Sequence, residues 1–289
     1  MKFKKNAIVS LTYITLVVCL LFVLIPFAWT VVSSLKLESD ILETEVRWIP
    51  KTVTFEHYKW VIGMRTERVT ETAKTLGLLI AYRNTGIATV GTALLTVISA
   101  ILGGYALSRF NFRGRIPISI LVLSTALFPL VLMMVPWYLI LKKLHLIDNL
   151  FGLVLTLSAF VTPFSVWMMK GFIGTIPPEL EECAMIDGCT KVGAFMRVTL
   201  PLITSGVVAV VMYTVVMTWN AYLLPLIVCG STNTKPISII LMELFSFYGR
   251  TYWGGLMAAT VVTCLPVVVL FVFLQKQFVS GMTAGAVKG

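Results

Sequence analysis

Long uninterrupted runs of apolar residues are the feature of this sequence that most limits what it can fold into. Several reach about 20 residues, the length at which an α-helix crosses a hydrocarbon core about 30 Å thick. Hydrophobic residues make up 58% of the 289 residues and charged residues only 12%, against about 25% charged in soluble domains. Only helices and closed barrels satisfy their backbone hydrogen bonds inside lipid. The sequence therefore predicts an all-α membrane protein.

Six apolar runs are long enough to be transmembrane helices. They cover residues 8–35, 84–107, 117–141, 150–169, 202–229 and 252–274. The first run is longer than the core of a signal peptide, so we interpret it as a retained span. A polar segment at 36–83 is expected to hold one or two short helices. Since no internal repeat or composition shift marks a second domain, residues 1–289 are predicted to form a single transmembrane domain.

Basic residues in two short segments set the predicted orientation. Neither segment contains an acidic residue, and their basic residues are Lys2, Lys4 and Lys5 before the first span and Arg109, Arg113 and Arg115 after the second. The positive-inside rule places both segments in the cytosol. The prediction is an N-in, C-in protein with the polar segment 177–201, between spans four and five, and the tail 275–289 in the cytosol. This topology also explains the net charge of +10 without invoking nucleic acid.

Several functional classes are disfavoured by what the sequence lacks. The six runs contain no Asp, Glu, Lys, Arg or His, whereas charge-coupled carriers and cation channels place ionisable groups at membrane depth. Phosphate-loop, nucleophile-elbow and zinc-protease motifs are missing. His57 and His145 are far apart and without a carboxylate cluster. We therefore expect no catalytic residue, no metal site and no cofactor bound by this chain.

Glycine and proline residues inside the runs leave two interpretations open. They are consistent with bends beside a cavity and equally with the ordinary tolerance of these residues in membrane helices. The residues are Pro26, Gly103, Gly104, Pro129, Pro136, Pro163, Pro225 and Pro266.

A polar patch in the fifth run also has two interpretations. It consists of Trp219, Asn220 and Tyr222. An aromatic ring beside an amide suits a neutral polyol, which would make these residues part of a substrate pathway. The alternative is that they pack and hydrogen-bond between neighbouring helices.

The segment 177–201 reads as two short helices joined by a bend. Pro178 and the glutamates at 179, 181 and 182 suit the first turn of a helix, because carboxylates are favoured near its positive dipole end. Gly188 suits the left-handed conformation that commonly ends a helix. A second helix is predicted over 190–199, since apolar residues recur there at helical spacing. Pro201 then opens the fifth span.

The same segment carries a resemblance to a known family. Glu182-Cys183-Ala184, with Gly188 four residues after Ala184 and Val198-Thr199-Leu200-Pro201 at the end, resembles the EAA loop of ABC importer permeases. In that family the loop reads E-A-A-x-x-x-G followed by I-x-L-P, and the sugar permeases also match Asp187 and Phe195. Cys183 and Ser205 depart from the pattern. The tail 275–289 resembles the ending of maltose-type carbohydrate permeases, and Trp219-Asn220 resembles a motif in their fifth span.

The resemblance implies a permease subunit of an ATP-driven importer of a sugar or oligosaccharide, in a prokaryotic cell membrane. The implied partners are a second homologous permease, two ATPase subunits that carry ATP and Mg²⁺, and an extracytoplasmic solute-binding protein, received by the outer loops 36–83 and 230–251. The residues implied in coupling to the ATPase are Glu182, Ala184, Asp187, Gly188, Phe195, Leu200 and Pro201. Those implied in tail contacts are Thr283, Gly285 and Lys288.

Other classes remain open at this point. One is a permease of the same superfamily for a polyamine, phosphate or glycerol phosphate ester. Another is an ATP-independent carrier or channel, and a third is a membrane scaffold that transports nothing. The segment 177–201 alone is also compatible with an amphipathic hairpin at the membrane surface, although glutamates in its first turn disfavour contact with anionic lipid.

Overall fold

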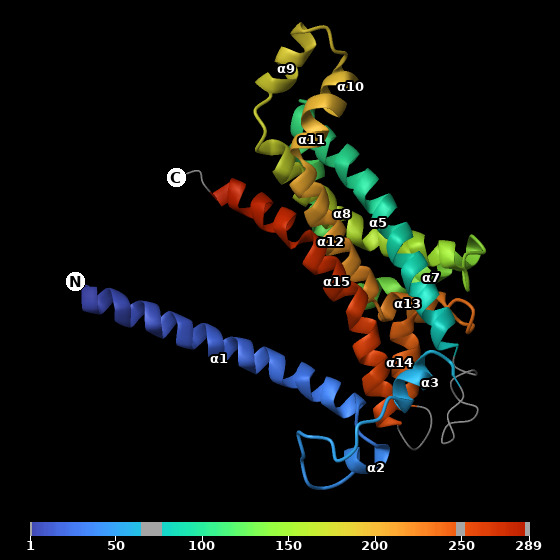
Figure 1. Ribbon diagram of the computed structural model, residues 1–289. Helices are drawn as coiled ribbons and strands as arrows, with labels where there is room; N and C mark the ends of the chain where they lie inside the picture. The colour runs from blue at the N-terminus through green and yellow to red at the C-terminus, as the bar shows by residue number, and fades with distance from the viewer. Residues whose placement is uncertain (1, 65–76, 247–251, 287–289) are drawn as a thin grey trace. The chain divides into compact units, whose positions relative to one another are not determined.

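The structure is a computed structural model that describes residues 2–64, 77–246 and 252–286, and within these the side chains of residues 9–64, 77–245 and 252–276. Every regular element in the described ranges is a helix (Figure 1). The helices are α1 (Lys2–Ser34), α2 (Glu38–Ile41), α3 (Glu56–Val61), α5 (Leu78–Arg109), α6 (Arg115–Ala126), α7 (Leu130–Lys143), α8 (Leu150–Gly174), α9 (Glu179–Ile186), α10 (Lys191–Ala194), η1 (Phe195–Thr199), α11 (Leu200–Leu202), α12 (Thr204–Trp219), α13 (Leu223–Val228), α14 (Ile237–Ser246) and α15 (Trp253–Ala286).

Four helices are long and apolar enough to cross a membrane: Val9–Ser34 of α1, α5, α8 and Trp253–Lys276 of α15. Two bent pairs, α6 with α7 and Lys191–Leu202 with α12, raise the number to six if each pair is one span. The prediction of an all-α membrane protein is therefore confirmed, with four to six spans. Helices α5, α8 and α15 extend beyond the predicted runs, and α15 continues helically into the predicted tail.

The run 117–141, which we predicted as one span, is divided into two helices. Helices α6 and α7 meet at an angle of 95°, and Pro129, with an extended ψ of 117°, is the N-cap of α7. Proline disfavours helical geometry in the residue before it, here Phe128, so the helix ends just ahead of it.

The run 202–229 is also divided, into α12 and α13, with the break at residues 220–222. A proline in a helix interior loses one hydrogen bond and clashes with the carbonyl four residues earlier. Because α13 starts at Leu223, Pro225 falls within its first turn, where that cost is small.

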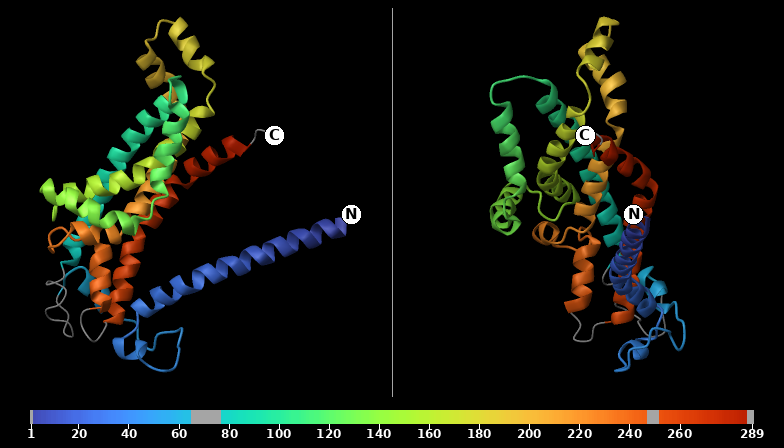
Figure 2. Two further views of the ribbon diagram at one scale, coloured as in Figure 1. Left: turned by 180° about the vertical axis from the view of Figure 1, so that it is seen from behind. Right: turned by 90° about the vertical axis from the view of Figure 1, so that its left-hand side faces the viewer.

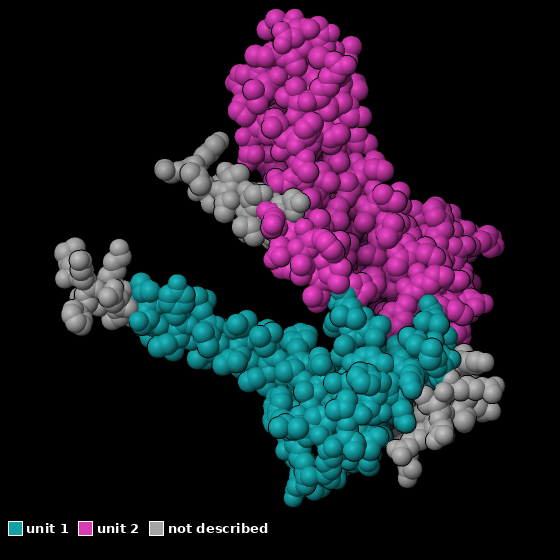
Figure 3. Space-filling model, viewed as in Figure 1, with its two compact units in different colours: residues 1–79, 241–265 teal, residues 80–240, 266–289 magenta. Residues whose placement is uncertain are grey.

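The chain divides into two compact units (Figure 3). Unit 1 comprises residues 1–79 and 241–265, and unit 2 comprises residues 80–240 and 266–289. Each unit has its own packing and is described separately.

Unit 1 is held by polar contacts at the start of α15. The carboxylate of Glu38 accepts from the backbone N–H groups of Trp253 and Gly254 at 2.9 and 2.8 Å. The His57 ring bridges the Lys36 carbonyl (2.7 Å) and the Tyr252 hydroxyl (2.5 Å). The bonds to Glu38 satisfy backbone N–H groups that a helix start leaves without a partner.

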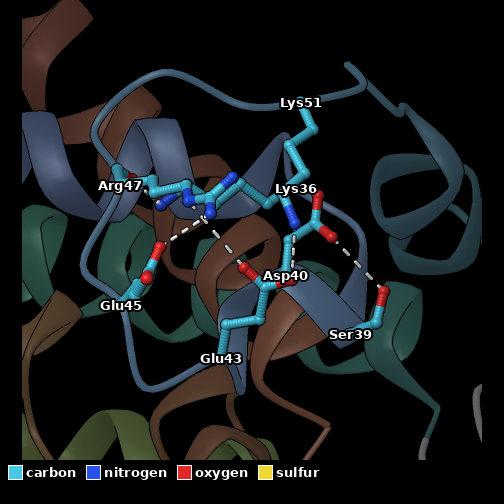
Figure 4. A network of polar contacts seen from close by, with 7 residues as sticks. All are labelled: Lys36, Ser39, Asp40, Glu43, Glu45, Arg47 and Lys51. Carbon is cyan, nitrogen blue, oxygen red and sulfur yellow. Dashed lines mark hydrogen bonds and ion pairs between the residues drawn. The ribbon is translucent and has the colours of Figure 1, made fainter.

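The polar segment 36–83 contains the expected short helices, α2 and α3, in its described part. Figure 4 shows ion pairs across this loop, from Lys51 to Glu43 and from Arg47 to Glu45. Because these side chains are exposed to solvent, such pairs add little to stability. Lys36 is buried and holds this loop more firmly. Its Nζ lies 4.1 Å from the centre of the Trp29 ring and donates to the Arg47 carbonyl.

Unit 2 is built on α8, which packs against α6 and α12. Leu153 and Leu157 of α8 belong to one buried cluster with Leu224 and Val228 of α13. Farther along α8, Met169 and Ile173 belong to a second cluster with residues of α5 and α12. Because α8 is buried on several sides, it determines where the helices that pack on it lie.

The loop between α13 and α14 is fastened by Asp148. Its Oδ1 accepts from the backbone N–H groups of Gly230 (3.0 Å) and Ser231 (2.9 Å) and from the Thr234 hydroxyl. The Thr234 hydroxyl and the Ser231 backbone N–H lower the pKa of Asp148 to about 2. Across the same loop, the Asn84 amide donates to the Asn233 and Lys235 carbonyls.

Gly103 and Gly104 allow close packing and do not break α5, which is continuous through both. A β-carbon on Gly104 would lie 2.9 Å from the Lys170 backbone nitrogen. Pro26, Pro136, Pro163 and Pro266 likewise lie inside continuous helices. Pro129, in contrast, lies at the 95° bend between α6 and α7.

We predict that Gly104→Ala lowers the free energy of unfolding by about 1–3 kcal/mol, because α5 and α8 must move apart. Gly86→Ala, in the same helix, is the matched control: its added β-carbon would meet nothing within 4 Å, so stability should stay level or rise slightly. Thermal unfolding midpoints of the purified variants in detergent would measure both. Equal midpoints would contradict the close α5–α8 contact.

Candidate functional site

Helices α9 and α10 project beyond the ends of α5 and α8 at one end of unit 2 (Figures 1 and 2). Helix α9 begins as predicted, with Pro178 as its N-cap and Glu179, Glu181 and Glu182 in its first turn. Carboxylates at this end interact favourably with the helix dipole. The three glutamates nevertheless differ, because Glu181 is buried while the other two are exposed.

Helix α9 ends at Gly188, as the sequence predicts. The φ of Gly188 is +91°, a left-handed conformation that costs other L-residues about 1–2 kcal/mol. The Gly188 N–H donates to the Met185 carbonyl (3.1 Å) and the Cys189 N–H to the Ala184 carbonyl (2.9 Å). This pair of bonds is the Schellman arrangement that closes helices.

The second helix is not the regular α-helix that we predicted over 190–199. Thr190 caps α10 by accepting from the Gly193 N–H at 3.1 Å, and a π-helix, η1, follows over Phe195–Thr199. Pro201 provides a reason, since its ring would clash with the carbonyl four residues earlier in a regular α-turn. The wider π-turn before Pro201 relieves that crowding.

The buried carboxylate of Glu181 is the centre of a polar cluster. Only 6% of Glu181 is exposed, and its Oε1 accepts from Arg109 Nε at 2.7 Å and from the Thr199 hydroxyl at 2.6 Å. Its Oε2 accepts from the Tyr105 hydroxyl at 2.8 Å. Arg109 also donates to the Ile176 carbonyl at 2.9 Å. The cluster therefore joins α9 to the end of α5 and to η1.

The electrostatics of this cluster keep Glu181 ionised. Burial, the largest effect, would raise the pKa of Glu181, but hydrogen bonds from Thr199, Arg109 and Tyr105 together with the Arg109 charge lower it below its ordinary value. A buried ion pair is costly to break, because removing one partner leaves the other charge buried alone.

The outer face of the pair is apolar and exposed. Ile186 is 85% exposed and Val192 69%, and Leu180, Met185 and Met196 are also exposed. The acidic side chains of Glu182 and Asp187 lie exposed on the same helix pair. Several exposed apolar side chains with charged neighbours are typical of a protein interaction surface.

The residues implied in coupling thus fall into two groups. Glu182, Asp187, Gly188 and Pro201 are exposed, and Ala184 is half-buried. Phe195 and Leu200 face inward. The centres of the Phe195 and Tyr105 rings lie 4.7 Å apart, and Leu200 packs against the second core cluster.

Glu181 is the residue that sequence reasoning missed. The sequence shows it only as one of three glutamates in the first turn of α9. Nothing in the sequence indicates that Arg109, 72 residues away, is its partner.

The candidate pathway residues do not converge on one polar site. Trp219 lines an apolar groove with residues of α5 and α15. The Asn220 amide donates to the Val216 carbonyl of its own helix at 2.8 Å, while Tyr222 packs against the first core cluster. Thr283, Gly285 and Lys288 lie outside the residues whose side chains the structure describes.

Comparison with known proteins places this architecture in a class. Residues 95–284 match the family model described as "Binding-protein-dependent transport system inner membrane component". The chain is 32% identical to the diacetylchitobiose uptake system permease protein DasC of Streptomyces coelicolor, over 96% of each chain. It is also 32% identical to the arabinooligosaccharides transport system permease protein AraQ of Bacillus subtilis, over 97% of this chain and 96% of the relative.

A solved structure shares the fold. It is a crystal structure of a bacterial ABC transporter involved in the import of the acidic polysaccharide alginate, with a TM-score of 0.80, 21% identity, and coverage of 95% of this chain and 98% of the other. Fold and relatives together define a multi-pass membrane transport subunit. The chain belongs to the family of inner membrane components of binding-protein-dependent transport systems.

We predict that Glu181→Gln lowers the free energy of unfolding by about 3 kcal/mol, because Arg109 is left buried without a counter-charge. Glu182→Gln, one residue away and exposed, should change it by no more than about 0.5 kcal/mol. Denaturant unfolding of each full chain in detergent would measure the difference. Equal loss in both variants would contradict the assignment of the buried carboxylate.

The lowered pKa of Glu181 predicts a pH dependence. A carboxyl group whose pKa is lower in the folded chain adds stability above its ordinary pKa, 4.5, and loses it as pH falls through the folded value. The stability of the natural chain should therefore decline more steeply below pH 4.5 than that of Glu181→Gln. Parallel curves for the two proteins would contradict this prediction.

Proposed function

We propose that the chain is the permease subunit of an ATP-driven importer of a sugar or oligosaccharide, forming half of its translocation pathway. The supporting observation is the helix pair α9 and α10, which exposes apolar side chains on its outside and is tied to α5 by the buried Glu181–Arg109 pair. The chain that carries this pair belongs to a transport family. Relatives named for diacetylchitobiose and for arabinooligosaccharides support the substrate class.

In the proposed assembly the chain has six spans, with both termini in the cytosol. It works with a second permease, two ATPase subunits that bind ATP and Mg²⁺, and an extracytoplasmic solute-binding protein. The segment 177–201 and the tail 275–289 contact the ATPase subunits, and the loops 36–83 and 230–251 receive the binding protein. Hydrolysis takes place on the ATPase subunits, so this chain is not a catalyst.

The proposed coupling runs through Glu181. An ATPase subunit that docks on Ile186 and Val192 pushes α9, and the buried carboxylate passes the displacement to Arg109 at the end of α5. A buried ion pair with several hydrogen bonds transmits such motion well, because separating its members is costly. Trp219, Asn220 and Tyr222 remain candidates for the substrate pathway.

The bend at Gly188 tests the coupling. Gly188→Val should reduce ATP-driven uptake at least tenfold, because valine is strained at positive φ and reorients α9 against α10. Gly188→Asn is the matched control, since asparagine tolerates this conformation, and should keep most uptake. The measurement is substrate uptake into vesicles containing the complete transporter, with membrane insertion checked in parallel. Full uptake by Gly188→Val would overturn the proposed role.

The substrate is tested on the solute-binding protein. A ligand screen on that protein should retain a sugar or oligosaccharide, and uptake of the same compound should require ATP and the ATPase subunits. Retention of a polyamine, phosphate or glycerol phosphate ester would overturn the substrate class alone. Flux through the purified chain without any ATPase would overturn the importer itself.

A further inference from the structure

A pocket of about 660 Å³ lies where α5 turns into α6. Its lining includes three basic residues, Arg113 and Arg115 around the turn and Lys170 from α8. None of the pocket's lining residues is acidic. Three positive charges around one cavity make it a site for an anion.

In the described part of the chain, no ion pair neutralises the positive charges at this pocket. Arg115 donates to the Leu107 and Ser108 carbonyls and to the Asn111 amide oxygen, all of them neutral. Lys170 Nζ donates to the Ser119 hydroxyl at 2.7 Å. Such bonds fix the directions of the basic groups while leaving their charges available to a ligand.

An apolar groove of about 890 Å³ continues from this pocket between α5, α6 and α8. Phe112 lines both cavities, so the two adjoin at this residue. Its lining residues are mainly aliphatic, and Ala159 is an exposed one among them. Ser158 lines it too, with a buried hydroxyl that has no partner in the described part of the chain.

The groove has the length of one membrane leaflet. Along α8 it runs from Leu155 to Val166, which at 1.5 Å per residue is about 16 Å. Half of a hydrocarbon core is about 15 Å. Lys170 lies one helical turn beyond Val166, about 6 Å farther along α8, at the depth expected for a headgroup.

We propose that this composite site binds one anionic phospholipid, with the phosphate at Arg113 and Lys170 and an acyl chain in the groove. Basic pockets between membrane helices are suited to anionic lipid headgroups. A free phosphate ion would leave the apolar groove unused. A protein segment would need an acidic group at one end of a leaflet-long apolar stretch, whereas every anionic phospholipid already has that shape.

The test is the amount of phosphatidylglycerol that remains bound to the complete transporter after purification in detergent, measured by mass spectrometry per mole of protein. A double variant, Arg113→Gln with Lys170→Gln, should bind phosphatidylglycerol about 25-fold more weakly, because each lost charge weakens binding about fivefold. Ala159→Phe should also lower it by filling the groove while leaving the charges in place. Lys142→Gln with Lys143→Gln, an exposed basic pair in α7, is the matched control and should retain the natural amount.

Three results would overturn the proposal. One is undiminished phosphatidylglycerol on both the charge and the groove variants. Another is displacement of the lipid by inorganic phosphate alone, which would reduce the site to an anion pocket. The third is cross-linking of a cysteine placed at Ala159 to a second transporter chain, which would show that protein covers the groove. None of these results bears on whether the transporter imports a sugar.

Discussion

The ion pair between Glu181 and Arg109 is the interaction on which the arrangement of the segment 177–201 depends. Helices α9 and α10 are short and expose much of their apolar surface, so propensity and burial alone hold them weakly. One buried carboxylate accepts from three side chains, Arg109, Tyr105 and Thr199, and Arg109 also bonds the Ile176 carbonyl. This cluster supplies what packing does not. It allows a surface segment to behave as an extension of the membrane helices beneath it.

The apolar runs were sufficient to predict the class of fold, because bilayer thickness translates directly into helix length. They were less informative about whether each run forms one continuous helix. The bend at Pro129 follows from the tendency of proline to end a helix just before it. Pro163, inside the continuous helix α8, has the same tendency but does not end its helix. Whether a proline bends a helix depends on how its neighbours re-satisfy the freed carbonyl, and those neighbours come from distant parts of the sequence.

The site was predictable where its geometry is local. Gly188 could be identified because a helix end and a positive φ leave few alternatives to glycine. Glu181 could not be separated from Glu182, since adjacent residues differ only in which face of α9 meets α5. The basic pocket shows the same limit: Arg113 and Arg115 were visible as topological signals, but Lys170 joins them only through the packing of α8 on α5 and α6.

The π-turn at Phe195–Thr199 has a consequence for register. A π-turn accommodates one more residue than an α-turn over nearly the same rise. Removing one residue between Gly188 and Leu200 would let the turn relax to α geometry, so the loss would be absorbed within the turn and Leu200 would keep its direction. In a regular α-helix the same deletion would rotate every later residue by about 100°. The π-turn therefore makes the orientation of α12 relative to the surface formed by α9 and α10 tolerant of the loss of one residue.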